Sequence, residues 1–432
     1  MSVNYRAELT GVFGDPLDDN PTGVMEEAAL ASSIQLRFSP PSTNDILCQH
    51  QNAGRCHSCT NIKVSYDEQL ATKEMRVRDE LADVAGATDI AWLPPVASSP
   101  TSFRTSAKLV VGGTRRRPTL GILGHDRRGV DLPDCPIQHS AINRATPGLK
   151  RFIRQLNLTP YDVPTKSGEL KYVLLTVGAN NALMCRFVLR TRDRVSDIRA
   201  ALPSLFDLVP NLKVVTANIH PTHEAIVEGP DEIILTKRRT LEMEVGDVQL
   251  ALGPRSFTQT NTDVAGELYR QVTEWAVSDN EADQPRSAWD LYCGVGGFAL
   301  HLASAGITPV TGVEVSDQAI ASAIQGARQL KLRRADAQFI AEDATAWAAR
   351  QPAESRPDAL VINPPRRGIG SELASWINES GIPRVIYSSC NPKSLARDLT
   401  EMPNYRGLEA RVFDMFPHTD HAEVVVLMSR AD

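Results

Sequence analysis

The stretch that decides the fold is Ala288-Trp289-Asp290-Leu291-Tyr292-Cys293-Gly294-Val295-Gly296-Gly297-Phe298-Ala299-Leu300. It reads as an apolar strand, a tight turn with three glycines, and the start of a helix. Glycine lets a ligand approach the backbone closely, because any Cβ would occupy the ligand's space. The pattern therefore predicts a doubly wound α/β domain with a ligand at the turn. The alternative is a glycine turn that serves only strand–helix packing.

An acidic residue downstream narrows the choice of ligand. Glu314 lies seventeen residues after Gly297, at the end of the next predicted strand. In doubly wound sheets an acid at this place accepts hydrogen bonds from ribose hydroxyls. The turn does not match the Gly-x-Gly-x-x-Gly pattern of dinucleotide sites, so we expect a ligand with adenosine and no pyrophosphate. S-adenosylmethionine fits that description.

Apolar strands alternate with helical stretches on both sides of the glycine turn. Such alternation implies βαβ units around a mainly parallel sheet. We therefore expect residues 245–432 to form a Rossmann-like domain of the kind used by S-adenosylmethionine-dependent methyltransferases. Its predicted strands are residues 288–292, 310–314, 359–362, 384–388 and the closing run 422–428.

The preceding part of the chain has a different texture. Residues 46–244 read as an α+β region, with helical spacing between about 60 and 95 and then short β-rich runs. Those runs are residues 108–111, 172–177, 185–189 and 213–217. Residues 1–45 are rich in Gly, Pro, Asp and Ser and are expected to be a poorly ordered extension.

Length and charge exclude several classes of protein. The chain has 432 residues, of which 42% are hydrophobic and 23% charged, so it is long enough for two or three globular domains. Its 46 basic and 52 acidic residues give a net charge of −6, which argues against bulk nucleic-acid binding through net positive charge. We find no apolar run near the ~18 residues of a membrane helix and no signal-peptide layout, so a cytoplasmic protein is expected.

Two turns after predicted strands carry reactive side chains. Cys390 lies just beyond the strand predicted at 384–388 and before a helical stretch, whose dipole is expected to stabilise a thiolate. The common alternative is a small buried apolar residue. Asn363-Pro364-Pro365-Arg366 ends another strand at the same edge. A similar Asn-Pro-Pro in amino-methylating DNA enzymes is followed by an aromatic residue, so Arg366 counts against that chemistry.

A further cysteine group lies upstream. Cys48, Cys56 and Cys59 lie close together and Cys135 follows far downstream, so four thiolates are available. Four thiolates suit either a 4Fe–4S cluster or a structural zinc ion. Unligated surface thiols are the alternative.

Five motifs in order resemble the RNA uracil-C5 methyltransferase family. They are residues 257–261 (Phe-Thr-Gln-Thr-Asn), the glycine turn 290–297, residues 363–368 (Asn-Pro-Pro-Arg-Arg-Gly), residues 388–392 (Ser-Ser-Cys-Asn-Pro) and residues 415–423 (Met-Phe-Pro-His-Thr-Asp-His-Ala-Glu). The match covers about 257 to 423, and the cysteine group extends it back to about 48.

The resemblance implies a role for each matched position. Cys390 corresponds to the nucleophile that adds to uracil C6, and Glu423 to the base that removes the C5 proton. The four cysteines correspond to ligands of a 4Fe–4S cluster. Relatives commonly have Phe where this chain has Tyr292, so an aromatic side chain is retained at this position of the donor-binding site. The positions that correspond to the binding site of the S-adenosylmethionine methyl donor are Gln259, Tyr292, Gly294, Gly296, Glu314 and Asn363.

The resemblance also implies an RNA substrate. Within the family, the chain is most similar to members that methylate 23S ribosomal RNA and lack the N-terminal β-barrel (TRAM) module, because only 47 residues precede Cys48 and they lack strand patterning. We expect a hairpin-loop uridine, since a base leaves its stack most easily in a loop. The alternatives are transfer RNA methylation, a non-catalytic RNA-binding assembly factor and an adenine amino-methyltransferase. The oligomeric state is not predicted.

Basic runs in the central region are candidate phosphate contacts. They are Arg115–Arg117, Arg127–Arg128, Lys150–Arg151 with Arg154, and Lys237–Arg239. If they lie on one face, RNA affinity should fall steeply with salt concentration.

Overall fold

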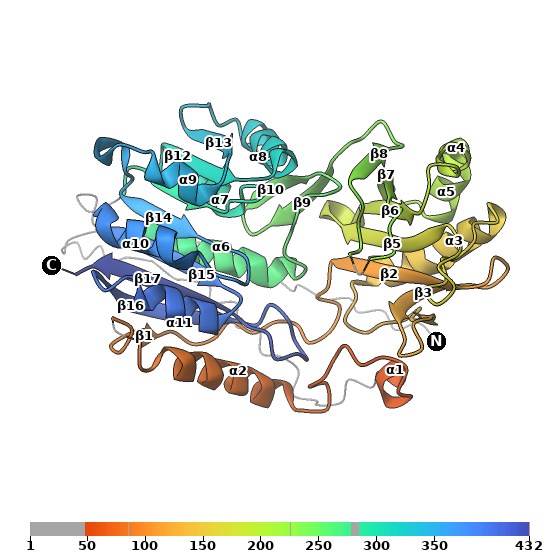
Figure 1. The fold of residues 1–432 in the computed structure, drawn as a ribbon, viewed down its shortest axis with the longest axis horizontal. Helices are drawn as coiled ribbons and strands as arrows, with labels where there is room; N and C mark the ends of the chain where they lie inside the picture. Colours follow the sequence, from red (N-terminus) through yellow and green to blue (C-terminus); the bar gives the residue numbers. More distant parts are fainter. Residues whose placement is uncertain (1–47, 85, 225, 278–284, 432) are drawn as a thin grey trace, which may run out of the picture. The chain divides into compact units, whose positions relative to one another are not determined.

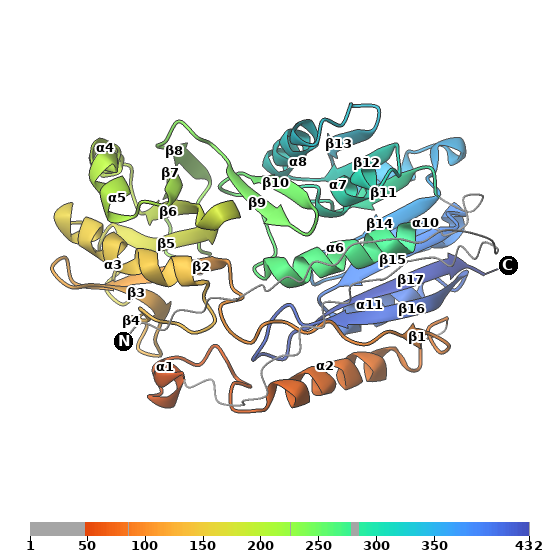
Figure 2. The ribbon, with the colours of Figure 1, turned by 180° about the vertical axis from the view of Figure 1, so that it is seen from behind.

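The computed structural model describes residues 48–431, apart from 85, 225 and 278–284. The expected extension at residues 1–45 lies outside the described residues. Two large sheets organise the described chain (Figures 1 and 2).

The carboxyl-terminal sheet has eight strands in the order β1-β16-β17-β15-β14-β11-β12-β13. Neighbouring strands from β15 through β14, β11 and β12 to β13 run parallel, whereas β17 is antiparallel to both β15 and β16. This confirms the predicted mainly parallel sheet with a closing strand. The strands are β1 (Ala91–Trp92), β11 (Ala288–Leu291), β12 (Val310–Glu314), β13 (Ala337–Ala341), β14 (Ala359–Ile362), β15 (Arg384–Ser389), β16 (Tyr405–Phe413) and β17 (Glu423–Arg430).

Helices cover both faces of this sheet, as a doubly wound fold requires. One apolar core lies between the sheet and α6 (Thr262–Ala276), α7 (Gly297–Ser304) and α8 (Asp317–Gln329). The other lies under α2 (Tyr66–Leu81), α9 (Ala344–Ala349), α10 (Gly370–Ser380) and α11 (Pro392–Thr400). The four central strands are buried except for the end residues Glu314 and Arg384, which is why they do not show the alternation of buried and exposed residues of a one-sided sheet.

The central region forms a second sheet of seven strands, in the order β4-β3-β2-β5-β6-β7-β8. Its own apolar core packs under α3 (Ser140–Gln155), α4 (Val195–Ala200) and α5 (Leu202–Leu208). The predicted β-rich runs are confirmed as strands. The remaining bounds are α1 (Gln49–Asn52), β2 (Ser106–Gly113), β3 (Pro118–Leu123), β4 (Gly129–Asp131), β5 (Leu170–Val177), β6 (Leu183–Leu189), β7 (Leu212–Ile219), β8 (Asp231–Ile234), β9 (Leu241–Val245) and β10 (Val248–Leu252).

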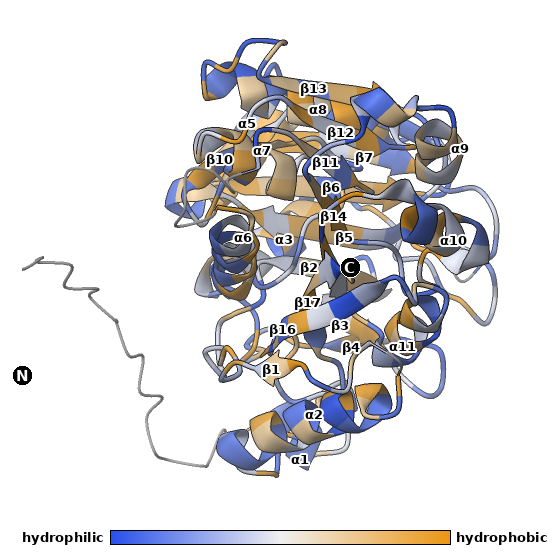
Figure 3. Cartoon of the chain, turned by 90° about the vertical axis from the view of Figure 1, so that its left-hand side faces the viewer, coloured by the Kyte–Doolittle hydropathy of each residue, from blue (hydrophilic) through white to orange (hydrophobic). Residues whose placement is uncertain are grey.

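The helix expected between 60 and 95 forms as α2 and packs against the carboxyl-terminal sheet. It contacts α11 and β16, and β1, which follows it in the chain, pairs in parallel with β16. Figure 3 shows both hydrophilic and hydrophobic segments on α2, as expected of a helix that packs by one face. Helix α2 and strand β1, which the sequence places in the 46–244 region, therefore cover and extend the carboxyl-terminal sheet. The domain boundaries themselves stay a prediction.

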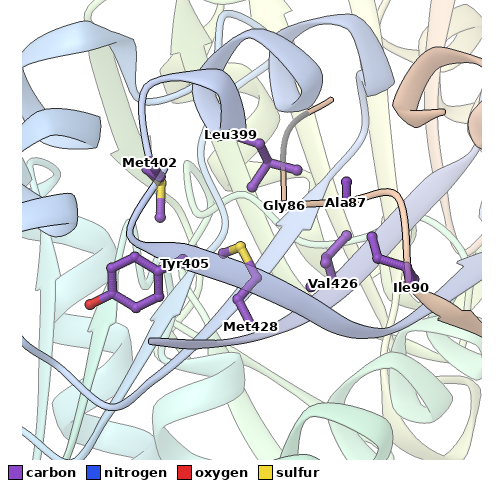
Figure 4. Close-up of a pocket in the computed structure, with 9 residues that line it drawn as sticks. Gly86, Ala87, Ile90, Leu399, Met402, Tyr405, Val426 and Met428 are labelled. Atoms are coloured by element: carbon purple, nitrogen blue, oxygen red, sulfur yellow. The ribbon is translucent and has the colours of Figure 1, made fainter. Parts of the chain in front are cut away.

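The segment between α2 and β1 makes close backbone contacts with strand β16. Gly407 donates its N–H to the carbonyl of Gly86 over 2.6 Å, and a Cβ on Gly86 would lie 2.5 Å from the carbonyl oxygen of Tyr405. Beside this contact Ile90 and Met428 line an apolar cavity of about 10 Å³ (Figure 4). The cavity is a packing gap, too small for a ligand.

Within the described residues, no helix combines the length and apolarity needed to cross a membrane.

Candidate active site

The predicted site residues gather at one edge of the carboxyl-terminal sheet. Four of them lie at the carboxyl ends of neighbouring parallel strands. Glu314 is the last residue of β12, and the residues that directly follow β11, β14 and β15 are Tyr292, Asn363 and Cys390. Glu423 begins β17, which runs antiparallel to β15 with Ser389 opposite Val424. Because of that reversed direction, the first residue of β17 reaches the same edge as the last residue of β15. Ligands of open α/β sheets bind at this edge.

The glycine turn has a backbone that most residues avoid. Gly294 and Gly296 have φ of +54° and +84°, in the left-handed region that favours glycine. Tyr292 also has a positive φ, +64°, which is a strained conformation for a bulky residue. A Cβ on Gly294 would meet no protein atom within 4 Å, so that space is open to a ligand. The turn thus has the close-approach geometry expected from the sequence.

A buried carboxyl group, that of Asp290, connects the strand before the glycine turn to the helix after it. Asp290 is completely buried, and its Oδ2 accepts a hydrogen bond of 2.9 Å from the N–H of Ala299 in α7. Burial raises the pKa of Asp290 to about 8, because a charge is costly away from water. Its other oxygen has no hydrogen-bond partner.

The remaining donor-binding candidates are placed as follows. One carboxyl oxygen of Glu314 accepts the N–H of Ser316 over 2.9 Å. The backbone of Asn363 donates to the carbonyl of Leu291 over 3.3 Å, beside the glycine turn. Gln259 lies in the loop between β10 and α6, outside the strand ends that carry the other candidates. The donor-binding roles of all six residues stay predictions.

Cys390 lies at the junction between β15 and α11, partly exposed. Helix α11 begins two residues after Cys390, and the stabilisation of its thiolate by the helix N-terminus stays a prediction. Burial raises the pKa of the Cys390 thiol, and the neighbouring Glu423 carboxylate raises it further, whereas the positive charge of Arg366 lowers it.

Arg366 is a further candidate residue, to which the sequence assigned no role in the site. Its carbonyl oxygen accepts a hydrogen bond of 2.9 Å from the side chain of Asn391, which caps α11 beside Cys390. Its guanidinium donates to the ring of His421 over 3.3 Å, and its positive charge lowers the pKa of the Cys390 thiol. The only signal in the sequence was an arginine where amino-methyltransferases have an aromatic residue.

Glu423 is buried within the sheet and bonded to its neighbour strand. Only 1% of its surface is exposed, and Oε1 accepts a hydrogen bond of 2.6 Å from the Ser388 hydroxyl on β15. Burial raises the pKa of Glu423 to about 7, and the Ser388 hydrogen bond acts in the opposite direction. A carboxyl group with such a pKa can exchange a proton near neutral pH, as a general base must.

Helix α2 and the segment before it contact the loop that precedes Glu423. Lys73 donates to Asp414 over 2.6 Å, and both side chains are buried, with 3% and 0% of their surface exposed. Gln69 accepts the backbone N–H of His418 over 2.9 Å, and the Asn61 side chain donates to Asp420 over 2.7 Å. These contacts join residues more than 340 positions apart, so no local pattern in the sequence could have found them.

The four cysteines line one cavity of about 140 Å³ between the amino-terminal segment and β2. Burial raises the pKa of Cys59 to about 12, and repulsion from the other three thiols adds to the shift. Three buried polar atoms in the cavity wall lack a hydrogen-bond partner, namely Nδ1 of His50 and the side-chain oxygens of Gln51 and Gln138. Buried polar atoms are normally satisfied, so this cavity has the character of a site for a polar group.

Within the part of the chain that the structure describes, no group of three or more His, Cys, Asp or Glu side chains is arranged to hold a metal ion. The four thiols line the wall of a cavity and do not converge on one position where a single ion would lie. The metal-ligand role of Cys48, Cys56, Cys59 and Cys135 therefore stays a prediction.

The predicted basic runs lie mostly on the surface. Arg115–Arg117 form the turn between β2 and β3, and Arg127–Arg128 the turn between β3 and β4; both runs are exposed. Lys150 is different, because it donates to Asp131 over 2.6 Å and is engaged within the protein.

Comparisons with known proteins match this arrangement. The family described as tRNA (Uracil-5-)-methyltransferase matches residues 351–431. The 23S rRNA (uracil(747)-C(5))-methyltransferase RlmC of Pectobacterium atrosepticum is 44% identical over 385 residues, which cover 89% of this chain and 100% of that protein. The protein of the same name from Halothiobacillus neapolitanus is 44% identical, with 89% and 99% covered.

The chain belongs to the RNA uracil-C5 methyltransferase family.

A solved structure of the family supports the fold. The tRNA (uracil-54, C5)-methyltransferase of Pyrococcus abyssi, in complex with S-adenosyl-L-homocysteine, superposes with a TM-score of 0.69 and 25% identity over 86% of this chain and 85% of that chain. The family resemblance inferred from the five motifs is thereby confirmed, and the chain is a methyltransferase with the α/β fold of this class.

Proposed function

We propose that this methyltransferase transfers a methyl group from S-adenosylmethionine to C5 of a uridine in 23S ribosomal RNA, through a covalent bond between Cys390 and uracil C6. The observation that carries the proposal is the meeting of Cys390 and Glu423 at the sheet edge that also carries the glycine turn. A nucleophile, a base and a donor site at one edge are the parts that this reaction needs.

The first step activates the pyrimidine. Uracil C5 is a poor nucleophile, but addition of the Cys390 thiolate to C6 moves the electron pair of the C5–C6 bond toward C5 and O4. The enolate can then attack a methyl group. Arg366 supports this step, because its positive charge favours the thiolate against burial and the charge of Glu423.

Methyl transfer and release follow. The C5 carbon takes the methyl group from the sulfonium, whose sulfur keeps the bonding pair and leaves as S-adenosylhomocysteine. The Glu423 carboxylate then removes the C5 proton, the C5–C6 double bond re-forms and the Cys390 thiolate leaves. Because the pKa of Glu423 is about 7, the carboxylate form needed for this step is present above neutral pH.

The methyl donor is assigned to the glycine turn. The open space beside Gly294 suits close approach of the donor, and Gly296 completes the turn. In this proposal Glu314 holds the ribose with its free carboxyl oxygen, Tyr292 packs against the donor, and Asn363 and Gln259 complete the site.

The cysteine cavity is proposed to hold a 4Fe–4S cluster on Cys48, Cys56, Cys59 and Cys135. All four thiols line the cavity, and its wall contains polar atoms without partners. A bound cluster would supply structural cross-linking, since it ties the segment around α1 to the loop that follows β4. Thiolate ligation would also reverse the raised thiol pKa values, because metal binding displaces the protons. Iron and zinc analysis of protein purified without oxygen decides between the cluster and a zinc ion.

The proposed substrate is a hairpin-loop uridine of 23S ribosomal RNA, because the relatives that match over nearly their whole length carry that substrate in their names. Exposed arginines in the turns of the central sheet are the proposed phosphate contacts, so affinity should weaken steeply with salt. Transfer RNA is the second candidate, since the matching family description and the solved relative name it.

The test uses S-adenosylmethionine with a labelled methyl group and three RNA samples: unmodified 23S ribosomal RNA, transfer RNA and a ribosomal RNA without the target uridine. Nucleoside analysis should find labelled 5-methyluridine only in the first. Cys390→Ala should abolish turnover, and Glu423→Gln should accumulate a protein–RNA adduct that survives denaturing electrophoresis. Substantial methylation by Cys390→Ala would refute the covalent mechanism. A labelled adenine would refute the uracil assignment, and labelled transfer RNA alone would replace the ribosomal substrate.

A further inference from the structure

Arg104 places a positive charge in the wall of the cysteine cavity. Its side chain lines the cavity together with the four cysteines, and its Nε donates to the carbonyl of Ser106 over 3.0 Å. Arg104 is only partly exposed and lines the same cavity as Cys59 and Cys135. The nearby groups that could balance its charge are therefore thiols, which carry negative charge only when deprotonated.

A partly desolvated cation next to neutral thiols is an unfavourable arrangement. Removing a guanidinium from water costs free energy unless an anion faces it. Four thiolates that bind a metal group would supply that negative charge. His50 adds to the polar wall: its Nε2 is 2.5 Å from Asp134, which leaves Nδ1 without a partner.

The backbone of Arg104 lies between the cysteine loop and the loop that carries Gln259. Its N–H donates to the carbonyl of Ile137, two residues after Cys135, over 2.9 Å. The next residue, Thr105, donates its backbone N–H over 2.7 Å and its hydroxyl over 3.0 Å to the carbonyl of Thr260. Thr260 directly follows Gln259, so one short segment contacts both sites.

We propose that Arg104 is a positioning residue that couples the cysteine site to donor binding. Its guanidinium neutralises the anionic metal–thiolate group, and its backbone and that of Thr105 hold the Gln259 loop in place for S-adenosylmethionine. This inference rests on the proposed function of the cysteine site. It assigns that site a purpose that the reaction at Cys390 does not require, namely to fix one wall of the donor site.

The test compares anaerobically purified wild-type protein with Arg104→Gln, Arg104→Lys, Thr105→Val and, as a control, the exposed-arginine variant Arg333→Gln. Two quantities are measured: the rate at which a chelator bleaches the visible absorbance, and the Kd for S-adenosylhomocysteine by calorimetry. Loss of a group that supports metal ligands typically weakens a site by about 10–100-fold. Arg104→Gln should therefore bleach at least about tenfold faster and bind S-adenosylhomocysteine more weakly.

The other variants separate charge from backbone position. Arg104→Lys keeps the charge and should bleach more slowly than Arg104→Gln. Thr105→Val should keep the wild-type bleaching rate while it weakens S-adenosylhomocysteine binding, and Arg333→Gln should match wild type in both measurements. A wild-type bleaching rate in Arg104→Gln overturns the proposal, and so does fast bleaching with unchanged affinity for S-adenosylhomocysteine. Wild-type protein without bound iron or zinc would instead refute the proposed cysteine site itself.

Discussion

Replacing Ser388 with Ala should shift the pH dependence of product release upward. The Ser388 hydroxyl donates to Oε1 of the buried Glu423 over 2.6 Å and is the contact that lowers the pKa of this carboxyl group against burial. In the proposed mechanism Glu423 acts as a base only when it is a carboxylate, so the rate should rise with pH through its pKa, which is about 7. Without the hydroxyl, the carboxylate loses a stabilising donor and its pKa should rise further.

The size of the shift follows from the strength of that hydrogen bond. A hydrogen bond to a charged group is worth about 1.5–3 kcal/mol, and one pKa unit corresponds to about 1.4 kcal/mol, so the shift should be roughly 1–2 units. At pH 7 the ionised fraction of Glu423 would fall from about one half to between roughly one tenth and one hundredth. Release of methylated RNA should therefore slow by about 5–50-fold at pH 7 and recover at pH 9.

The assay is a single turnover with excess enzyme, quenched in denaturant between pH 6 and 9.5. Electrophoresis separates the covalent protein–RNA adduct from released RNA, so the decay of the adduct reports the step assigned to Glu423. Ser380→Ala is the matched control, because Ser380 is also buried and bonds to the carbonyl of Ile377 at a distance from this site. A Ser388→Ala profile that superimposes on wild type would refute the reasoning, as would an equal loss of rate at every pH.

Two further predictions test the supports of the site. Lys73→Met leaves the buried Asp414 without its cation, and the loss of one partner of a buried pair typically lowers the free energy of unfolding by about 3–5 kcal/mol. The urea midpoint of unfolding should therefore fall, and it should partly recover in the Lys73→Met/Asp414→Asn double variant. An unchanged midpoint would show that water replaces the lysine. Gly294→Ala places a methyl group in space that no protein atom fills within 4 Å, so binding of S-adenosylhomocysteine should weaken at least about tenfold if the donor lies there. Gly306→Ala has the same open surroundings and a positive φ, and should bind like wild type; equal affinities in all three proteins would move the donor away from the glycine turn.

Much of the fold follows from local pattern. The strand before the glycine turn is buried throughout, and the strand before Cys390 is buried apart from its first residue, so their largely apolar sequences could be recognised as strands. Glycines that need positive φ mark the turn between β11 and α7. The order of strand, turn and helix also brings the ends of neighbouring parallel strands to one edge, which is why motifs at Tyr292, Asn363 and Cys390 could be expected to meet.

Tertiary structure alone decided how the reactive groups are tuned. The pKa of Cys390 depends on burial, on Glu423 and on Arg366, and the pKa of Glu423 depends on burial and on Ser388. The support that Lys73 gives to Asp414 spans 341 positions in the chain. Local sequence specifies which residue follows a strand, because backbone geometry is set by neighbours along the chain. The cost of a charge is set by the atoms and water that surround it in space, and these come from distant segments that only the folded chain brings together.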